Sequence, residues 1–218
     1  MESGFDPAER RGVYRAIEER RDMRHFLSTP IDEAVLTRLI NAAHLAPSVG
    51  YMQPWRFVRI RDASRRAALA ALVDREREAT AEALGERGAE FMRLKVEGIR
   101  ECAEVLVVAL GAGRERYVFG RRTLPQMDLA SASCAIQNLW LAARAEGLGM
   151  GWVSLFEPGA VRDVIQAPAG VEPIAILCLG HVERFYPGPM LELEGWDRRR
   201  PLDEVVMEDR WDEIDASR

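Results

Sequence analysis

The chain has 218 residues, of which 48% are hydrophobic and 30% are charged, a balance typical of a globular protein of one or two domains. Its formal net charge of −5 disfavours a nucleic-acid-binding surface, so local basic clusters are expected to serve a small anionic ligand or ion pairs. No apolar run approaches the roughly 20 residues that cross a bilayer. The polar N-terminal segment lacks the apolar core of a secretory signal. We therefore expect a cytoplasmic protein with no membrane partner.

The cysteines and histidines bear on disulfide bonding and on metal binding. Cys102, Cys134 and Cys178 are odd in number, lie in apolar stretches and form no C-x-x-C pair, which favours buried reduced thiols. The three histidines are scattered without metal-ligand spacing, so we expect no structural metal site.

The first half of the chain predicts mainly helices. Residues 1–8 are expected to be disordered, and the apolar stripe that follows predicts an amphipathic helix over 9–21. A second helix is expected to start at Thr29-Pro30-Ile31-Asp32, with Thr29 as its cap, and to end near Pro47. The remaining elements are a strand over 55–60 and a helical stretch over 62–101, broken near Gly85 and Gly88.

The second half predicts a layered α+β or α/β domain. Its expected elements are a buried strand over 104–110, a Gly/Arg-rich loop over 111–125, an apolar helix over 126–146, a strand over 152–156, a short helix over 158–166 and a strand over 174–179. The helix over 126–146 is apolar nearly all round, which is typical of a protein centre or a subunit interface. We expect one domain over 9–180 and an extension over 181–218 that wraps a partner subunit.

A basic cluster follows the first helix. Arg20, Arg21 and Arg24 lie within five residues and could grip a phosphate through charge-assisted, bidentate hydrogen bonds. Asp22 stands between them and weakens that grip electrostatically, so it is expected to serve another purpose. The alternative is a solvated charged turn.

A second candidate is the loop Ala46-Pro47-Ser48-Val49-Gly50-Tyr51-Met52-Gln53-Pro54-Trp55. Gly50 lets the backbone approach a planar ligand, exposed amides can bond to ring heteroatoms, and Gln53 can donate and accept. An ordinary connection between a helix and a strand is the alternative.

Three further positions are ambiguous. Ser154 has no G-x-S-x-G context, which disfavours a hydrolase nucleophile; it could bond to a ligand ring or to its own strand. Arg199 belongs to a second basic cluster, and Lys95 lies on a predicted helical stretch; either could be a solvated surface charge. The glycines of 147–151 follow a helix and precede a strand, the reverse of a dinucleotide fingerprint, so we expect them to cap the helix and turn the chain.

Taken together, the motifs resemble those of the nitroreductase-like flavoprotein family, from about Val13 to Val206. Within that family they are most similar to the 5,6-dimethylbenzimidazole synthase group. The segments that carry the resemblance are V-Y-R-A-I-E-x-R-R-D-M-R (13–24), A-P-S-V-G-Y-M-Q-P-W (46–55), L-K-V-E-G-I-R (94–100), P-Q-M-D-L (125–129), Q-N-L-W-L-A-A-R-A-E-G (137–147) and G-W-V-S-L-F (151–156).

The resemblance implies a fold and a reaction. The fold is a central mixed sheet of four or five strands flanked by helices, in a homodimer that exchanges its C-terminal arms. The reaction is fragmentation of reduced FMN by O2 to 5,6-dimethylbenzimidazole, the lower ligand of vitamin B12, and erythrose 4-phosphate. A separate NAD(P)H-dependent flavin reductase would supply the reduced FMN. The alternatives are an NAD(P)H-dependent nitro or flavin reductase and a non-catalytic flavin carrier.

The resemblance also implies residue roles. The catalytic positions would be Asp22, as a base kept ionised by its arginines, and Ser154, bonded to the ring edge. The flavin would be bound by those two residues and by Arg20, Arg21, Met23, Arg24, Ser48, Gly50, Gln53, Lys95 and Arg199. Residues 111–125, with Tyr117 and Phe119, would form a lid.

Overall fold

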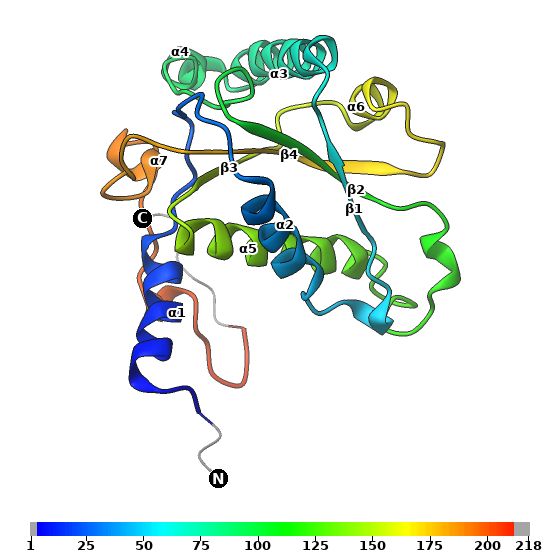
Figure 1. Ribbon diagram of the computed structural model, residues 1–218, viewed down its shortest axis with the longest axis vertical. Helices are drawn as coiled ribbons and strands as arrows, with labels where there is room; N and C mark the ends of the chain where they lie inside the picture. Colours follow the sequence, from blue (N-terminus) through cyan, green and yellow to red (C-terminus); the bar gives the residue numbers. More distant parts are fainter. Residues whose placement is uncertain (1–3, 212–218) are drawn as a thin grey trace. The chain divides into compact units, whose positions relative to one another are not determined.

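An antiparallel sheet of four strands organises the chain (Figure 1). The computed structural model describes residues 4–211, which divide into a unit that ends at Phe185 and a unit that begins at Tyr186. The first unit holds the sheet, in the order β1-β2-β4-β3. The strands are β1 (Trp55–Arg59), β2 (Glu104–Leu110), β3 (Gly149–Val153) and β4 (Glu172–Gly180).

The sheet differs from the expected mixed one. All three pairings between the four named strands are antiparallel. A parallel pairing does occur in the described part of the chain, but as an isolated bridge between Asp22 and Met150. The expected parallel character is therefore wrong for the named strands.

Each face of the sheet buries its own core because side chains alternate along a strand. Leu106 and Val108 of β2 point to a cluster with α2 (Glu33–His44) and α5 (Met127–Ala145). Val107 points to a second cluster, which includes side chains of α3 (Ala63–Ala83) and α6 (Pro158–Val164). Figure 1 shows α3, α4 (Gly88–Phe91) and α6 on one face of the sheet and α2 and α5 on the other.

Two helix starts differ from expectation. Helix α1 (Pro7–Glu19) begins inside the segment expected to be disordered, because Asp6 caps it by accepting hydrogen bonds from the amides of Ala8 and Glu9 at 2.7 and 2.9 Å. Helix α2 is capped by Asp32, and not by Thr29. Residues 1–3 lie outside the described residues.

Three motif residues also lie in other elements than expected. Gly147, at φ 76°, follows the end of α5 as expected. Gly149 and Gly151, however, lie inside β3 and do not turn the chain. Lys95 is outside any helix, because the chain breaks at Gly85 (φ 56°) and the short helix α4 ends at Phe91.

The second unit has little regular structure between Tyr186 and Trp211. It contains the short helix α7 (Met190–Leu193) and the single turn η4 (Leu202–Glu204). Its side chains Leu202 and Trp211 are exposed. Across residues 4–211, no helix is both long and apolar enough to cross a membrane.

Candidate active site

Asp22 is placed by an extended segment that leaves α1 and lies against β3. The amide of Met23 donates to the carbonyl of Met150 at 2.9 Å, next to the isolated bridge between Asp22 and Met150. Met23 is buried at 1% exposure, whereas the side chain of Asp22 is 42% exposed. Neighbouring residues of an extended segment point in opposite directions, so burial of Met23 turns Asp22 outward.

The two glycines of β3 make this approach possible. A Cβ added at Gly151 would lie 2.3 Å from the carbonyl oxygen of Met23 and 2.6 Å from Nη1 of Arg24. A Cβ at Gly149 would lie 3.1 Å from Cγ of Met23 and 2.5 Å from a methyl group of Val182. These glycines are therefore needed for space, which the sequence alone did not reveal.

Two hydrogen bonds fix the Asp22 carboxylate. Oδ1 accepts from the amide of Trp152 at 3.0 Å, and Oδ2 accepts from Nη2 of Arg24 at 2.7 Å. The same Nη2 donates to the carbonyl of Trp152 at 2.9 Å, so Arg24 ties the carboxylate to β3. Arg24 is buried, and the contacts of Nη2 make it a partner of Asp22, whereas its expected role as a phosphate ligand stays a prediction.

The pKa of Asp22 does not follow from its arginines alone. Although 42% of the side chain is exposed, surrounding protein atoms displace water from the carboxyl, and this desolvation raises its pKa above the ordinary value. The charge of Arg24, the amide of Trp152 and the charge of Arg20 lower the pKa, but they do not cancel the effect of burial. The arginines therefore favour the ionised carboxylate, as expected, but burial outweighs them, and the higher pKa makes the ionised carboxylate a stronger base.

The C-terminal half of α5 contacts the cluster of Arg20, Arg21 and Arg24, which we call the arginine corner. The Arg20 guanidinium lies 4.4 Å from the centre of the Trp140 ring, and Nε1 of Trp140 donates to the carbonyl of Arg21 at 3.1 Å. Arg144 forms an ion pair with Glu19 at the last turn of α1. Trp140 and Arg144 lie more than a hundred residues from these partners, so local sequence patterns did not mark them as site residues.

Ser154 lies two residues along the chain from Trp152, the residue whose amide binds the Asp22 carboxylate. It is exposed and directly follows β3. The structure thus brings the two expected catalytic residues to one end of one strand.

The loop of Ser48, Gly50 and Gln53 is tightly folded. Gly50 and Gln53 adopt left-handed backbone angles, at φ 53° and 48°, and Oγ of Ser48 accepts from the amide of Gln53 at 3.0 Å. That bond uses the acceptor side of the hydroxyl, so its proton can be directed to a ligand. Oγ of Ser131 on α5 accepts from the amide of Val49 at 3.1 Å, a contact that sequence reasoning missed.

These two groups of residues lie at opposite ends of α5 (Figure 1). Ser131 contacts the loop and Trp140 contacts the arginine corner, and nine residues of helix separate them by roughly 14 Å at about 1.5 Å per residue. Within one chain we therefore describe the loop and the arginine corner as two candidate half-sites.

The last two residues that were expected to bind the flavin are Lys95 and Arg199. Lys95 pairs with Glu101 at 2.8 Å. Its loop reaches the Asp22 segment at Gly98, where an added Cβ would lie 3.0 Å from the carbonyl oxygen of Arg24. Arg199 is exposed in the second unit, and its role stays a prediction.

The antiparallel sheet with helices packed on both faces defines a layered α+β fold. The chain belongs to the nitroreductase family, whose sequence profile matches residues 17–181. The resemblance inferred from the motifs is confirmed.

Two relatives and one solved structure are particularly similar. The chain is 44% identical over 201 residues to the 5,6-dimethylbenzimidazole synthase of Rhodospirillum rubrum, covering 90% of this chain and 94% of that protein. It is 37% identical over 206 residues to the 5,6-dimethylbenzimidazole synthase of Rhodobacter capsulatus, covering 91% and 97%. The fold matches the crystal structure of oxidised iodotyrosine deiodinase bound to FMN and 3-iodo-L-tyrosine, with a TM-score of 0.71 and 20% identity over 91% of this chain and 100% of that one.

Proposed function

We propose that this protein is a 5,6-dimethylbenzimidazole synthase. It would take reduced FMN as its substrate and O2 as co-substrate, and release 5,6-dimethylbenzimidazole, erythrose 4-phosphate and the remaining fragment from the pyrimidine end of the flavin. The observation that carries the proposal is the Asp22 carboxylate, fixed on β3 by Arg24 and the Trp152 amide yet 42% exposed. The 44% identity to a synthase of that name supports it.

The residues present fit a flavin mononucleotide. Arg20 and Arg21 provide guanidinium donors suited to its phosphate. The left-handed backbone at Gly50 and Gln53 shapes a loop that could meet a planar ring through its main chain. When bound, the reduced flavin supplies the electrons that reduce O2 and the ring carbons of the product.

Asp22 would remove a hydrogen from the first ribityl carbon. A general base must come within about 3 Å of the proton that it takes, directly or through one water. Its fixed orientation and raised pKa suit that role. Ser154, at the same strand end, would donate a hydrogen bond to the ring edge and so stabilise charge that develops there.

The protein would act as a homodimer. Helix α1 leaves an apolar stripe exposed, with Val13, Tyr14 and Ile17 at 46%, 66% and 50%. Such a stripe calls for a covering partner. A two-fold axis could bring the glycine loop of one subunit to the Asp22 corner of the other, which would join the half-sites.

Three further expectations complete the proposal. The C-terminal extension over 181–218 would be exchanged between the subunits. A separate NAD(P)H-dependent reductase would supply the reduced flavin, and the protein would work in the cytoplasm.

One experiment tests the proposed function. The purified protein is mixed anaerobically with reduced FMN, exposed to air, and its small molecules are identified by mass spectrometry. The proposal expects 5,6-dimethylbenzimidazole and erythrose 4-phosphate. Intact FMN alone would contradict it; fast bleaching of bound FMN by NADPH would then indicate a nitro or flavin reductase, and no bleaching a flavin carrier.

A further inference from the structure

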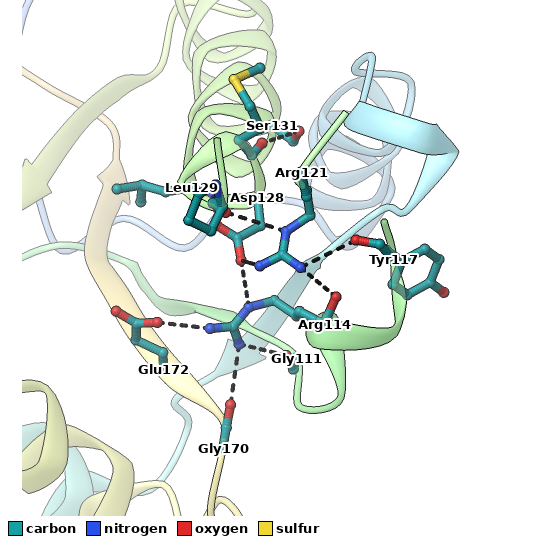
Figure 2. A network of polar contacts seen from close by, with 11 residues as sticks. Gly111, Arg114, Tyr117, Arg121, Asp128, Leu129, Ser131, Gly170 and Glu172 are labelled. Carbon is teal, nitrogen blue, oxygen red and sulfur yellow. Dashed lines mark hydrogen bonds and ion pairs between the residues drawn. The ribbon is translucent and has the colours of Figure 1, made fainter. Parts of the chain in front are cut away.

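Asp128 forms a buried ionic centre at the start of α5, outside the residues discussed above (Figure 2). One of its oxygens, Oδ2, accepts from Nε of Arg114 at 2.8 Å and from Nη2 of Arg121 at 3.0 Å. The three side chains are only 7%, 12% and 11% exposed. Buried charges of this kind depend on one another, because removing one leaves the others without compensation.

Both arginines come from the segment 111–125 and bind its own main chain. Nη1 of Arg114 donates to the carbonyl of Gly111 at 2.6 Å, and Nε of Arg121 donates to the carbonyl of Pro125 at 3.3 Å. Nη1 of Arg121 also donates to the carbonyl of Arg114 at 2.6 Å. Asp128 therefore holds both ends of residues 111–125, the first through the side chain of Arg114 and the last through that of Arg121.

The segment held in this way lies against the glycine loop. A Cβ added at Gly50 would lie 3.1 Å from the carbonyl oxygen of Phe119, and one at Gly120 would lie 2.4 Å from a methyl group of Val49. One helical turn from Asp128, Ser131 accepts from the amide of that same Val49. The first turns of α5 thus hold both the glycine loop and the segment that packs on it.

We propose that Asp128 is a positioning residue that keeps residues 111–125 packed on the glycine loop and so shields the flavin from water. This inference rests on the proposed function, because it takes the glycine loop to be part of the flavin site. Shielding matters because reduced FMN and O2 have a competing outcome. Two electrons and two protons pass from the flavin to O2, which gives hydrogen peroxide and intact FMN.

The test compares Arg121→Gln and Asp128→Asn with Glu172→Gln. Arg121→Gln keeps the pair between Arg114 and Asp128, so it is the gentler change. Glu172 is the matched control, because it also pairs with Arg114, at 2.8 Å, but is 56% exposed. The assays are the ratio of hydrogen peroxide to 5,6-dimethylbenzimidazole after reduced FMN meets air, and amide hydrogen exchange of residues 111–125 and 46–53 in protein without flavin.

Arg121→Gln should raise the peroxide ratio roughly tenfold, since water then reaches the reacting flavin, and should speed exchange in both segments. Glu172→Gln should change neither. Wild-type ratio and wild-type exchange in Arg121→Gln would overturn the inference, even if Asp128→Asn fails to fold. If the wild-type protein makes no benzimidazole, the proposed function has failed, and hydrogen exchange alone still decides whether Asp128 holds the two segments together.

Discussion

Replacing Gly151 by alanine should disrupt the placement of Asp22. The added Cβ would lie 2.3 Å from the carbonyl oxygen of Met23, whereas ordinary contact begins at 3.4 Å. The main-chain oxygen cannot rotate away as a side chain can, so the Asp22 segment must move by about 1 Å from β3. The bond from the Trp152 amide to Asp22, now 3.0 Å, would then exceed hydrogen-bonding distance.

The expected losses follow from that movement. Overpacking costs about 1–3 kcal/mol of unfolding free energy, and each lost hydrogen bond adds roughly 1 kcal/mol. A base displaced by about 1 Å loses on the order of a hundredfold in rate.

The assay pairs thermal unfolding with the initial rate of benzimidazole formation from reduced FMN in air. Gly12→Ala on α1 is the control for an added methyl group without a clash, because a Cβ there meets nothing within 4 Å; it should keep the wild-type rate and raise the unfolding free energy by roughly 0.5–1 kcal/mol, as expected in a helix. A Gly151→Ala protein with the wild-type melting temperature and rate would refute the reasoning.

The remaining predictions concern pH, the ionic centre and the arginine corner. Because the folded pKa of Asp22 is raised, its contribution to stability is present below the unfolded pKa and is lost as pH rises through the folded pKa. Urea unfolding of the wild type and Asp22→Asn at stepped pH should therefore show the difference between their unfolding free energies changing between those two pKa values. Benzimidazole formation should rise with pH over the same window, and a rate independent of pH there would remove Asp22 as the base. Asp128→Asn should lower unfolding free energy by about 3–5 kcal/mol, and Glu172→Gln by less than about 1 kcal/mol; equal effects would contradict the buried-centre account. Trp140→Phe removes the donor to Arg21 and should weaken FMN binding roughly tenfold by fluorescence titration, since the arginine corner loosens; unchanged affinity would show that Trp140 does not support it.

The elements that could be predicted are those whose signal is local. The sequence predicts β2 at its observed bounds. The run V-L-V-V-A-L is continuously apolar, which is typical of a strand that is buried on both faces and therefore shows no alternation of apolar and polar residues. Helix α5 was expected within one residue at each end for a similar reason, since an apolar helix between Pro125 and Gly147 has clear limits.

The misplaced elements are those whose signal was ambiguous. Thr29 and Asp32 are both good caps, and only the packed structure selects Asp32. Gly149 and Gly151 look like turn residues in a sequence. Their role is to admit the segment of Met23, which lies about 130 residues away along the chain.

The candidate site was predictable in its residues but not in its support. Asp22 and Ser154 could be singled out from motifs, and the structure brings them to the end of β3. Ser131 and Trp140 gave no such signal, because their partners lie 82 and 119 residues away and are brought close only by the fold.

The most direct test of the central claim is the fate of reduced FMN in air with the wild-type protein and with Asp22→Asn, followed by mass spectrometry of all flavin-derived products. We predict that the wild type converts FMN to 5,6-dimethylbenzimidazole, and that the Asn protein binds FMN but returns it intact with hydrogen peroxide. Benzimidazole formation by the Asn protein at the wild-type yield, or none by the wild type, would contradict the account.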